Sequence, residues 1–259
     1  MRVGLWVKRF LGLFLAMAIS YGLVQLMPAT ADPVALQALE GTAPTEVDGQ
    51  AIEGTTVFES RDSIEIYPSS TEPAAGFIFF PGGLVDPRAY THILTPIAQA
   101  GYLVVILKAP MDLPIIDIGG ASTVVDANPS VTTWAVGGHS LGGVAASTYA
   151  AGNPQEVPAV VLWASYPNTD LSTVGGLEAL SVAGANDMIT TPEDIEGAAA
   201  KLPVDTRYVE LEGVIHSYFG DYGEQEGDGT PGISRAWGQS RIVGVTKNWL
   251  DAYSGIKPE

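Results

Sequence analysis

The sequence predicts a single doubly wound α/β domain, with a mostly parallel sheet covered by helices on both faces. Short, continuously apolar segments alternate along the chain with longer segments of helical periodicity. Strands that are apolar throughout are typical of parallel sheets, because both faces of such a sheet are buried. The 259 residues suffice for one large domain, and the chain shows no internal repeat and no second domain boundary.

The expected elements follow one another in order. Residues 57–60 and 64–67 alternate in polarity and predict an antiparallel hairpin at the sheet edge. Continuous apolar segments predict buried strands at 77–80 and 102–107, and further strands are predicted at 132–136, 159–164, 177–183 and 207–211. Helices are predicted at 88–100, 115–127, 141–151, 192–201 and 233–253. The last helix carries an apolar stripe of Ile233, Trp237, Ile242, Val245 and Trp249.

The composition excludes several classes of function. With 29 acidic and 12 basic residues, the net charge of −17 argues against nucleic acid or an anionic membrane surface as a partner, but not against a small neutral ester. The chain has no cysteine, which excludes disulfides, thiolate metal sites and a cysteine nucleophile. We expect no metal ion and no cofactor, and the sequence specifies no oligomeric state.

The N-terminus predicts export to the periplasm or the cell exterior. A basic segment (Arg2, Lys8, Arg9) precedes an apolar run over residues 10–27, and Ala29-Thr30-Ala31 fits a small-x-small cleavage site. Residues 1–31 are therefore a signal peptide or a membrane anchor, and the anchor would be the only contact with a membrane. Residues 32–54 are expected to form a spacer with a short helix at 34–39, and residues 55–259 the α/β domain.

One short motif carries the chemistry. Gly138-His139-Ser140-Leu141-Gly142 fits the nucleophile-elbow pattern G-x-S-x-G. In such an elbow a strand stops, turns sharply through a strained serine and continues as a helix. The two glycines allow strand and helix to close together. The motif predicts Ser140 as a nucleophile.

A serine nucleophile needs a base, and histidine has a suitable pKa. The chain offers three histidines. His92 lies in a predicted helix, and His139 precedes the serine and is expected to point away from it. His216 follows the last predicted strand at the carboxyl edge of the sheet, where the sites of open α/β sheets lie. His216 is therefore the predicted base.

The base needs an acid that holds its tautomer. Asp187 follows the strand predicted at 177–183, and the order Ser140, Asp187, His216 is that of nucleophile-elbow hydrolases. Asp170 is the alternative acid, and Asp221 has weaker support.

Two backbone N–H groups are expected to stabilise the oxyanion. One belongs to Leu141, directly after the serine. The other lies in the Pro81-Gly82-Gly83-Leu84 loop, where Gly83 is preferred and Leu84 is the alternative.

With these motifs, the chain resembles the α/β-hydrolase superfamily over about residues 55–255. Segments 80–90, 137–143, 162–167 and 216–229 make it similar to bacterial dienelactone-hydrolase-like proteins of the hydrolase fold-5 type. That group proper uses a cysteine nucleophile, where this chain has Ser140. The resemblance therefore implies an α/β-hydrolase fold and ordinary serine-ester chemistry. No stretch is long enough for a large lid.

The sequence thus predicts a serine hydrolase that cleaves a carboxylic ester through a Ser-His-Asp triad and an acyl-enzyme. Two alternatives remain: an acyltransferase with the same triad, and a catalytically silent binding protein on the same fold. Residues 224–229 are acidic and Gly-rich but lack EF-hand spacing, and are predicted to form a solvated loop near the site.

Overall fold

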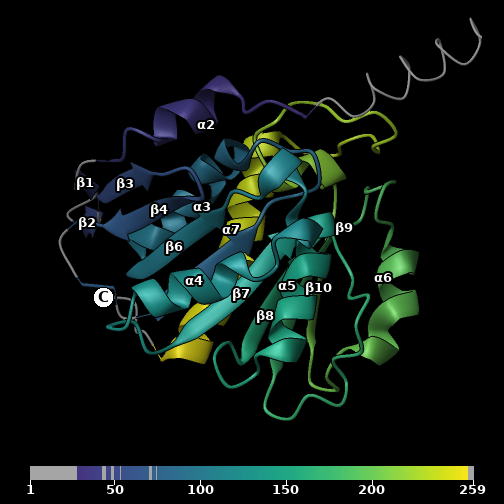
Figure 1. The fold of residues 1–259 in the computed structure, drawn as a ribbon. Helices are drawn as coiled ribbons and strands as arrows, with labels where there is room; N and C mark the ends of the chain where they lie inside the picture. Colours follow the sequence, from purple (N-terminus) through teal and green to yellow (C-terminus); the bar gives the residue numbers. More distant parts are fainter. Residues whose placement is uncertain are drawn as a thin grey trace, which may run out of the picture.

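A sheet of eight strands forms the centre of the protein (Figure 1). The computed structural model describes residues 28–42, 45–47, 50–52, 54–69, 72–73 and 75–255. Six neighbouring strands are parallel: β10 (Arg207–Leu211), β9 (Glu178–Gly184), β8 (Ala159–Trp163), β7 (Trp134–His139), β5 (Ala75–Phe80) and β6 (Tyr102–Leu107). The hairpin of β4 (Ser63–Pro68) and β3 (Thr55–Glu59) continues the sheet antiparallel beyond β6. The predicted parallel sheet with an antiparallel edge hairpin is confirmed.

The strand order reverses at β5. The chain passes from β5 to β6 on one side, and then crosses to β7 on the other side of β5. The loops that leave β5 and β7 therefore diverge and border a crevice at the carboxyl edge of the sheet, which is where open α/β sheets bind ligands.

Helices cover both faces of the sheet (Figure 1). The side chains of α3 (Thr91–Gln99) and α7 (Arg235–Ser254) join one buried cluster, and those of α4 (Gly120–Ala127) and α5 (Leu141–Gly152) join the other. Successive side chains of a strand point to opposite faces. In β5, Phe77 and Phe79 accordingly belong to the first cluster and Ile78 and Phe80 to the second. The doubly wound architecture is confirmed.

Some helices differ at their ends from the expectation. The segment predicted at 115–127 contains a 3-10 turn, Pro114–Ile116, and becomes α-helical only at Gly120. The helices predicted at 88–100 and 192–201 each combine a 3-10 turn (Pro87–Tyr90, Ala199–Lys201) with an α-helix, α3 or α6 (Pro192–Ala198).

The last helix, α7, begins at Arg235 because the Ser234 hydroxyl caps it by accepting the Trp237 N–H. Trp237 is 59% exposed. The predicted apolar stripe is therefore wrong at this position, and the buried face runs through Ile242, Val243, Trp249 and Leu250.

The described residues before β3 also contain regular structure. The helix α2 (Pro33–Ala38) corresponds to the one expected at 34–39, and packs on α3 with Ala35 fully buried. The strands β1 (Thr45–Val47) and β2 (Gln50–Ile52) pair antiparallel within the predicted spacer. Residues 1–27, with the predicted signal or anchor, lie outside the described part. Within that part, no helix is long and apolar enough to cross a membrane.

Candidate active site

Ser140 occupies a strained turn between β7 and α5. Its φ of 52° and ψ of −122° are unusual for a residue with a side chain, and such strain clusters at functional sites. The end of β8 holds this turn from one side. The Ser140 N–H donates to the Trp163 carbonyl at 3.0 Å, and the Ser165 hydroxyl donates to the Ser140 carbonyl at 2.7 Å. The predicted elbow geometry is present.

The glycines of the elbow are required by close backbone contacts. A Cβ on Gly142 would lie 2.0 Å from the Phe80 carbonyl oxygen and 2.3 Å from that of Pro81. A Cβ on Gly138 would lie 2.3 Å from the Gly142 carbonyl carbon. Because these neighbours are backbone atoms, no side-chain movement can make room.

Gly142→Ala is therefore expected to destabilise the fold by about 3 kcal/mol or more, because the overlap must separate α5 from the loop after β5. Urea unfolding would measure the change. Gly152→Ala is the matched control, since Gly152 lies in the same helix with no atom within 4 Å of its Cβ position. A Gly142→Ala midpoint equal to that of the control would contradict the expectation.

His216 and Asp187 form a buried pair. His216 opens a 3-10 turn (His216–Phe219) after β10, and Asp187 follows β9. The His216 Nδ1 lies 2.8 Å from the Asp187 Oδ2, and both residues are 1% exposed. The other carboxylate oxygen accepts the N–H groups of Ile189 and Thr190, each at 2.8 Å. These bonds orient the carboxylate toward the imidazole.

The elbow lies directly beside this pair. The ring centroids of His139 and His216 are 4.5 Å apart, and His139 immediately precedes Ser140. Within the described part of the chain, no hydrogen bond joins the Ser140 hydroxyl to His216. Catalytic hydrogen bonds are often long before substrate binds. The structure thus brings two predicted residues into contact and places the third next to them.

The His139 ring lies against the His216 ring, with 4.5 Å between their centroids. Burial, with a smaller effect of neighbouring His216, lowers the pKa of His139 well below its usual value. The Tyr90 hydroxyl accepts the Gly82 N–H at 2.9 Å and shares a hydrogen bond of 2.8 Å with the His139 Nδ1. The His139 ring also stacks on the Phe219 ring, with an interplanar angle of 10°. The sequence carried no signal for these contacts.

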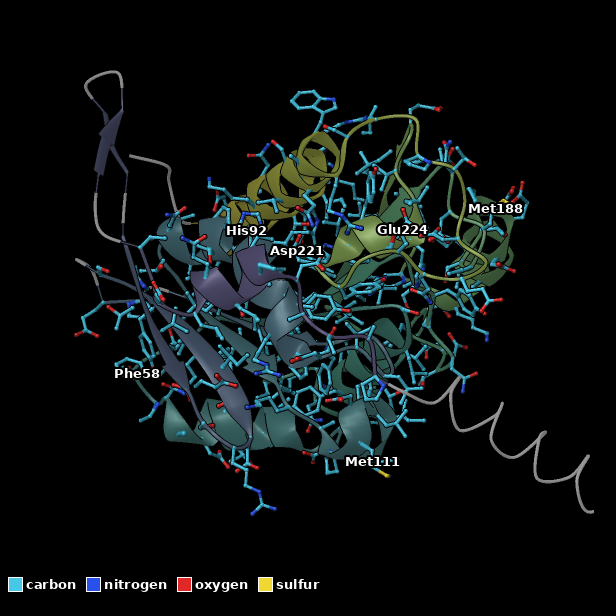
Figure 2. The ribbon with its side chains drawn as sticks, turned by 90° about the horizontal axis from the view of Figure 1, so that it is seen from above. Phe58, His92, Met111, Met188, Asp221 and Glu224 are labelled. Carbon is cyan, nitrogen blue, oxygen red and sulfur yellow. The ribbon has the colours of Figure 1, made fainter. Side chains whose placement is uncertain are left out.

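The other acids and histidine considered from the sequence lie apart from this pair. The Asp221 carboxylate contacts the His92 Nδ1 at 3.1 Å and accepts the Gln239 amide at 2.9 Å (Figure 2). The hydrogen bond to Asp221 raises the pKa of His92. Asp170 is exposed and accepts hydrogen bonds from Ser172. Asp187 is therefore the only one of the three candidate acids that contacts His216.

Gly83 and Leu141, the two residues expected to supply the oxyanion N–H groups, lie next to each other at the elbow. A Cβ on Gly83 would lie 2.7 Å from the Leu141 Cδ2, so the two residues are in contact. The Leu84 N–H is already donated to the Asp112 carbonyl at 2.7 Å. Among the described residues, the Gly83 and Leu141 N–H groups have no acceptor. The structure favours Gly83 over the Leu84 alternative.

The sequence matches the model of the alpha/beta hydrolase family over residues 76–240. The chain belongs to this family. No curated protein matches the chain. The narrower likeness to dienelactone-hydrolase-like proteins stays a prediction.

Solved structures of other hydrolases are similar to this alpha/beta hydrolase in fold. A CIB-like hydrolase from Thermoplasma acidophilum is 17% identical, with a TM-score of 0.53 over 80% of this chain and 96% of that one. A thermostable carboxylesterase cloned from a metagenomic library is 14% identical, with a TM-score of 0.58 over 87% and 94%. A fungal esterase from Rhizomucor miehei is 15% identical, with a TM-score of 0.57 over 85% of each chain. Such low identities establish the shared fold alone.

A short N-terminal segment, residues 29–32, bonds to the loop that follows β5 and to Asp221. The Ala29 N–H donates to the Leu84 carbonyl at 2.6 Å, and the Asp86 N–H donates to the Ala29 carbonyl at 2.8 Å. The Asp32 N–H donates to the Asp221 carbonyl at 2.7 Å. Ala29 therefore bonds to both Leu84 and Asp86 in the loop that carries Gly83.

A chain that begins at Asp32 is expected to have a lower kcat than one that begins at Pro28, because it lacks both bonds between Ala29 and the loop. Loss of a whole oxyanion donor costs about 10²–10³-fold, and a loosened loop is expected to lose part of that. Ester turnover by the two purified chains checks this. Equal kcat values would show that this segment does not support the loop.

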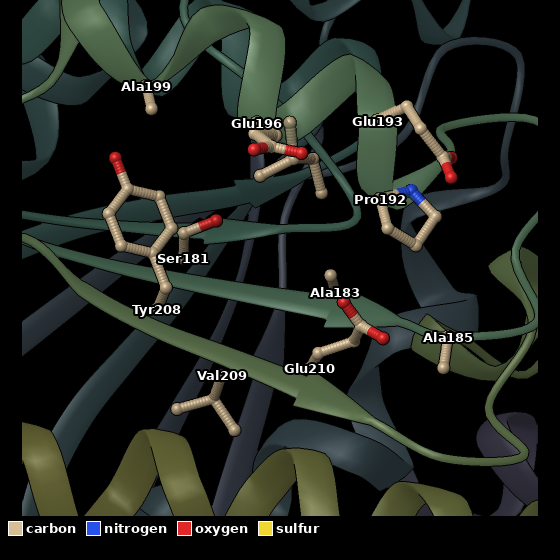
Figure 3. Close-up of a pocket in the computed structure, with 11 residues that line it drawn as sticks. Ser181, Ala183, Ala185, Pro192, Glu193, Glu196, Ala199, Tyr208, Val209 and Glu210 are labelled. Atoms are coloured by element: carbon tan, nitrogen blue, oxygen red, sulfur yellow. The ribbon is translucent and has the colours of Figure 1, made fainter.

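One cavity of the structure lies on another part of the sheet, between α6 and the strands β9 and β10. Its volume is about 630 Å³, and the carboxylates of Glu193, Glu196 and Glu210 lie around it (Figure 3). None of Ser140, Asp187 and His216 lines this cavity. In the described part of the chain, no three acidic or histidine side chains are arranged to hold a metal ion.

Proposed function

We propose that this alpha/beta hydrolase is a serine hydrolase that cleaves carboxylic esters with Ser140, His216 and Asp187. The observation that carries the proposal is the buried Asp187–His216 hydrogen bond of 2.8 Å beside a serine in a strained elbow. Esterases among the structures of similar fold add support.

The proposed reaction follows from the placement of these groups. The Ser140 Oγ attacks the ester carbonyl while the His216 Nε2 takes the hydroxyl proton. The N–H groups of Gly83 and Leu141 stabilise the carbonyl oxygen as it becomes negative. The carbon–oxygen bond to the alcohol then breaks, and His216 returns the proton to the leaving alcohol. Water, deprotonated by His216, attacks the acyl-enzyme in the same way, which releases the carboxylic acid and restores Ser140.

Exposed apolar side chains that are adjacent in sequence to residues of the site favour an apolar acyl group. Tyr166 follows Ser165, which bonds the elbow, and Met188 follows Asp187. Met111 precedes Asp112, whose carbonyl accepts the Leu84 N–H. Tyr166, Met188 and Met111 are 40%, 66% and 71% exposed, and Figure 2 shows both methionines at the periphery of the molecule. Each of these three exposed apolar side chains is thus next in sequence to a residue that belongs to the site or bonds to it, and this supports an apolar acyl group.

A panel of p-nitrophenyl esters of graded acyl length, together with fluorophosphonate labelling, tests the proposal. We expect kcat/KM to rise from acetyl to hexanoyl esters, because each methylene removed from water contributes about 0.8 kcal/mol. Peptide mapping should find the label on Ser140. Absence of turnover and of labelling would contradict the proposal. Transfer of the acyl group to an added alcohol in preference to water would identify an acyltransferase instead.

We also propose that residues 1–31 direct export, on the strength of the basic segment, the apolar run and the small-x-small site. N-terminal sequencing of the native protein separates a cleaved signal from a retained anchor, and only a chain that keeps Ala29 has the bonds to the loop after β5. Recovery of the full chain from the cytoplasmic fraction would contradict export.

A further inference from the structure

We propose that Asp228 is a positioning residue for His216, and that the loop around it braces the base and the acid of the site together. This inference rests on the proposed function. Asp228 lies in the acidic, Gly-rich segment 224–229, which the sequence predicted to be a solvated loop. Residues 224–227 are exposed as expected, whereas Asp228 is half-buried and bonds to the His216 turn.

The Asp228 carboxylate binds the backbone of the His216 turn. Its Oδ1 accepts the His216 N–H at 2.9 Å, and its Oδ2 accepts the Ser217 N–H at 2.7 Å. The Oδ1 also accepts the N–H of Gly229 at 2.8 Å, which fixes the carboxylate on its own loop. Hydrogen bonds to an ionised acceptor are roughly twice as strong as neutral ones. The backbone position from which the imidazole extends is therefore held by a charge.

A cation holds the same turn from its carbonyl side. The Arg235 guanidinium donates to the Ser217 carbonyl at 2.5 Å and to the Gly220 carbonyl at 2.7 Å. It also lies over the Tyr218 ring, with 5.0 Å between the guanidinium carbon and the ring centroid. The turn that begins with His216 is therefore held on both sides: the Asp228 carboxylate binds its N–H groups, and the Arg235 guanidinium binds its carbonyl groups.

The Asp228 loop also contacts the residue next to the catalytic acid. The Asn186 side-chain amide donates to the Thr230 carbonyl at 2.8 Å. Gly229 lies so close to Asn186 that a Cβ on it would be 1.6 Å from the Asn186 carbonyl oxygen. Asn186 directly precedes Asp187. A single loop thus bonds to the backbone of His216 and to Asn186, the residue before Asp187. The strand β9 leads only to Asp187, and β10 leads only to His216.

Asp228→Asn is the test variant, because it keeps the size of the side chain but presents an amide to one of the N–H groups. The control is Glu226→Gln, which removes the same charge from an exposed residue of the same loop. Displacement of a catalytic group by about 1 Å costs on the order of 10²-fold, so we expect kcat to fall by up to that factor while KM changes little. The low-field proton resonance of the His216–Asp187 hydrogen bond should broaden in Asp228→Asn and stay sharp in the control.

A kcat equal to that of Glu226→Gln, or an unchanged low-field resonance, would overturn the inference. If Asp228→Asn does not fold, Asp228→Ser replaces it, since a serine hydroxyl can still accept one N–H of the turn. This resonance reports on the His216–Asp187 hydrogen bond in the absence of any substrate. A failure of the proposed esterase function would appear as absent turnover and labelling in the unmutated protein, and is therefore distinguishable from a failure of the Asp228 inference.

Discussion

Replacing Ser140 with alanine is expected to lower ester turnover by on the order of 10⁴–10⁶-fold and to abolish fluorophosphonate labelling. The variant lacks the only atom that can form the acyl-enzyme in the proposed mechanism. The rate is not expected to fall to that of water, because the Gly83 and Leu141 amides and the substrate contacts remain. Initial rates on a p-nitrophenyl ester, with the wild-type enzyme diluted to match, would measure the loss.

The fold of Ser140→Ala should be unchanged. The bonds that hold the elbow join the Ser140 N–H to Trp163 and the Ser140 carbonyl to Ser165, and neither uses the Ser140 hydroxyl. Ser165→Ala is the matched control: it loses the bond to the elbow carbonyl but keeps the nucleophile, and should still be labelled. Wild-type turnover in Ser140→Ala, in a preparation with a native unfolding transition, would refute the assignment of the nucleophile.

The fold was predictable because it depends on patterns that extend over many residues. Continuously apolar segments mark strands buried on both faces, and β5, β6 and β8 in the parallel part of the sheet are of this kind. The ends of helices depend on single contacts and were less predictable. The cap on α7 needs the Ser234 hydroxyl to meet a particular N–H, and periodicity does not encode that contact.

The central residues of the candidate site were predictable for a related reason. In a parallel sheet, loops that follow successive strands meet at one edge, so Asp187 and His216 could be placed together from strand positions alone. The supports of the site were not predictable. Ala29 bonds to a loop more than fifty residues away, and Asp228 binds backbone N–H groups, which every sequence contains. Such contacts leave no residue pattern from which they could be inferred.

Asp187→Asn is expected to lower kcat by about 10⁴-fold while the structure of the site is preserved. The asparagine oxygen can still accept the N–H groups of Ile189 and Thr190, which bind the Asp187 Oδ1. Its amide then faces the His216 Nδ1 and donates to it. The imidazole must therefore carry its proton on Nε2, where it cannot accept the proton of Ser140.

Asp170→Asn is the matched control for this change, because Asp170 is the alternative acid, follows the neighbouring strand β8 and bonds only to Ser172 among the described residues. We expect wild-type kcat in Asp170→Asn. The low-field proton resonance of the His216–Asp187 bond should disappear from Asp187→Asn and persist in the control. Because the two variants remove one charge each, a difference between them must come from contact with His216 and not from the net charge of the protein. Equal losses in both variants, or a loss confined to Asp170→Asn, would show that Asp187 does not hold the base.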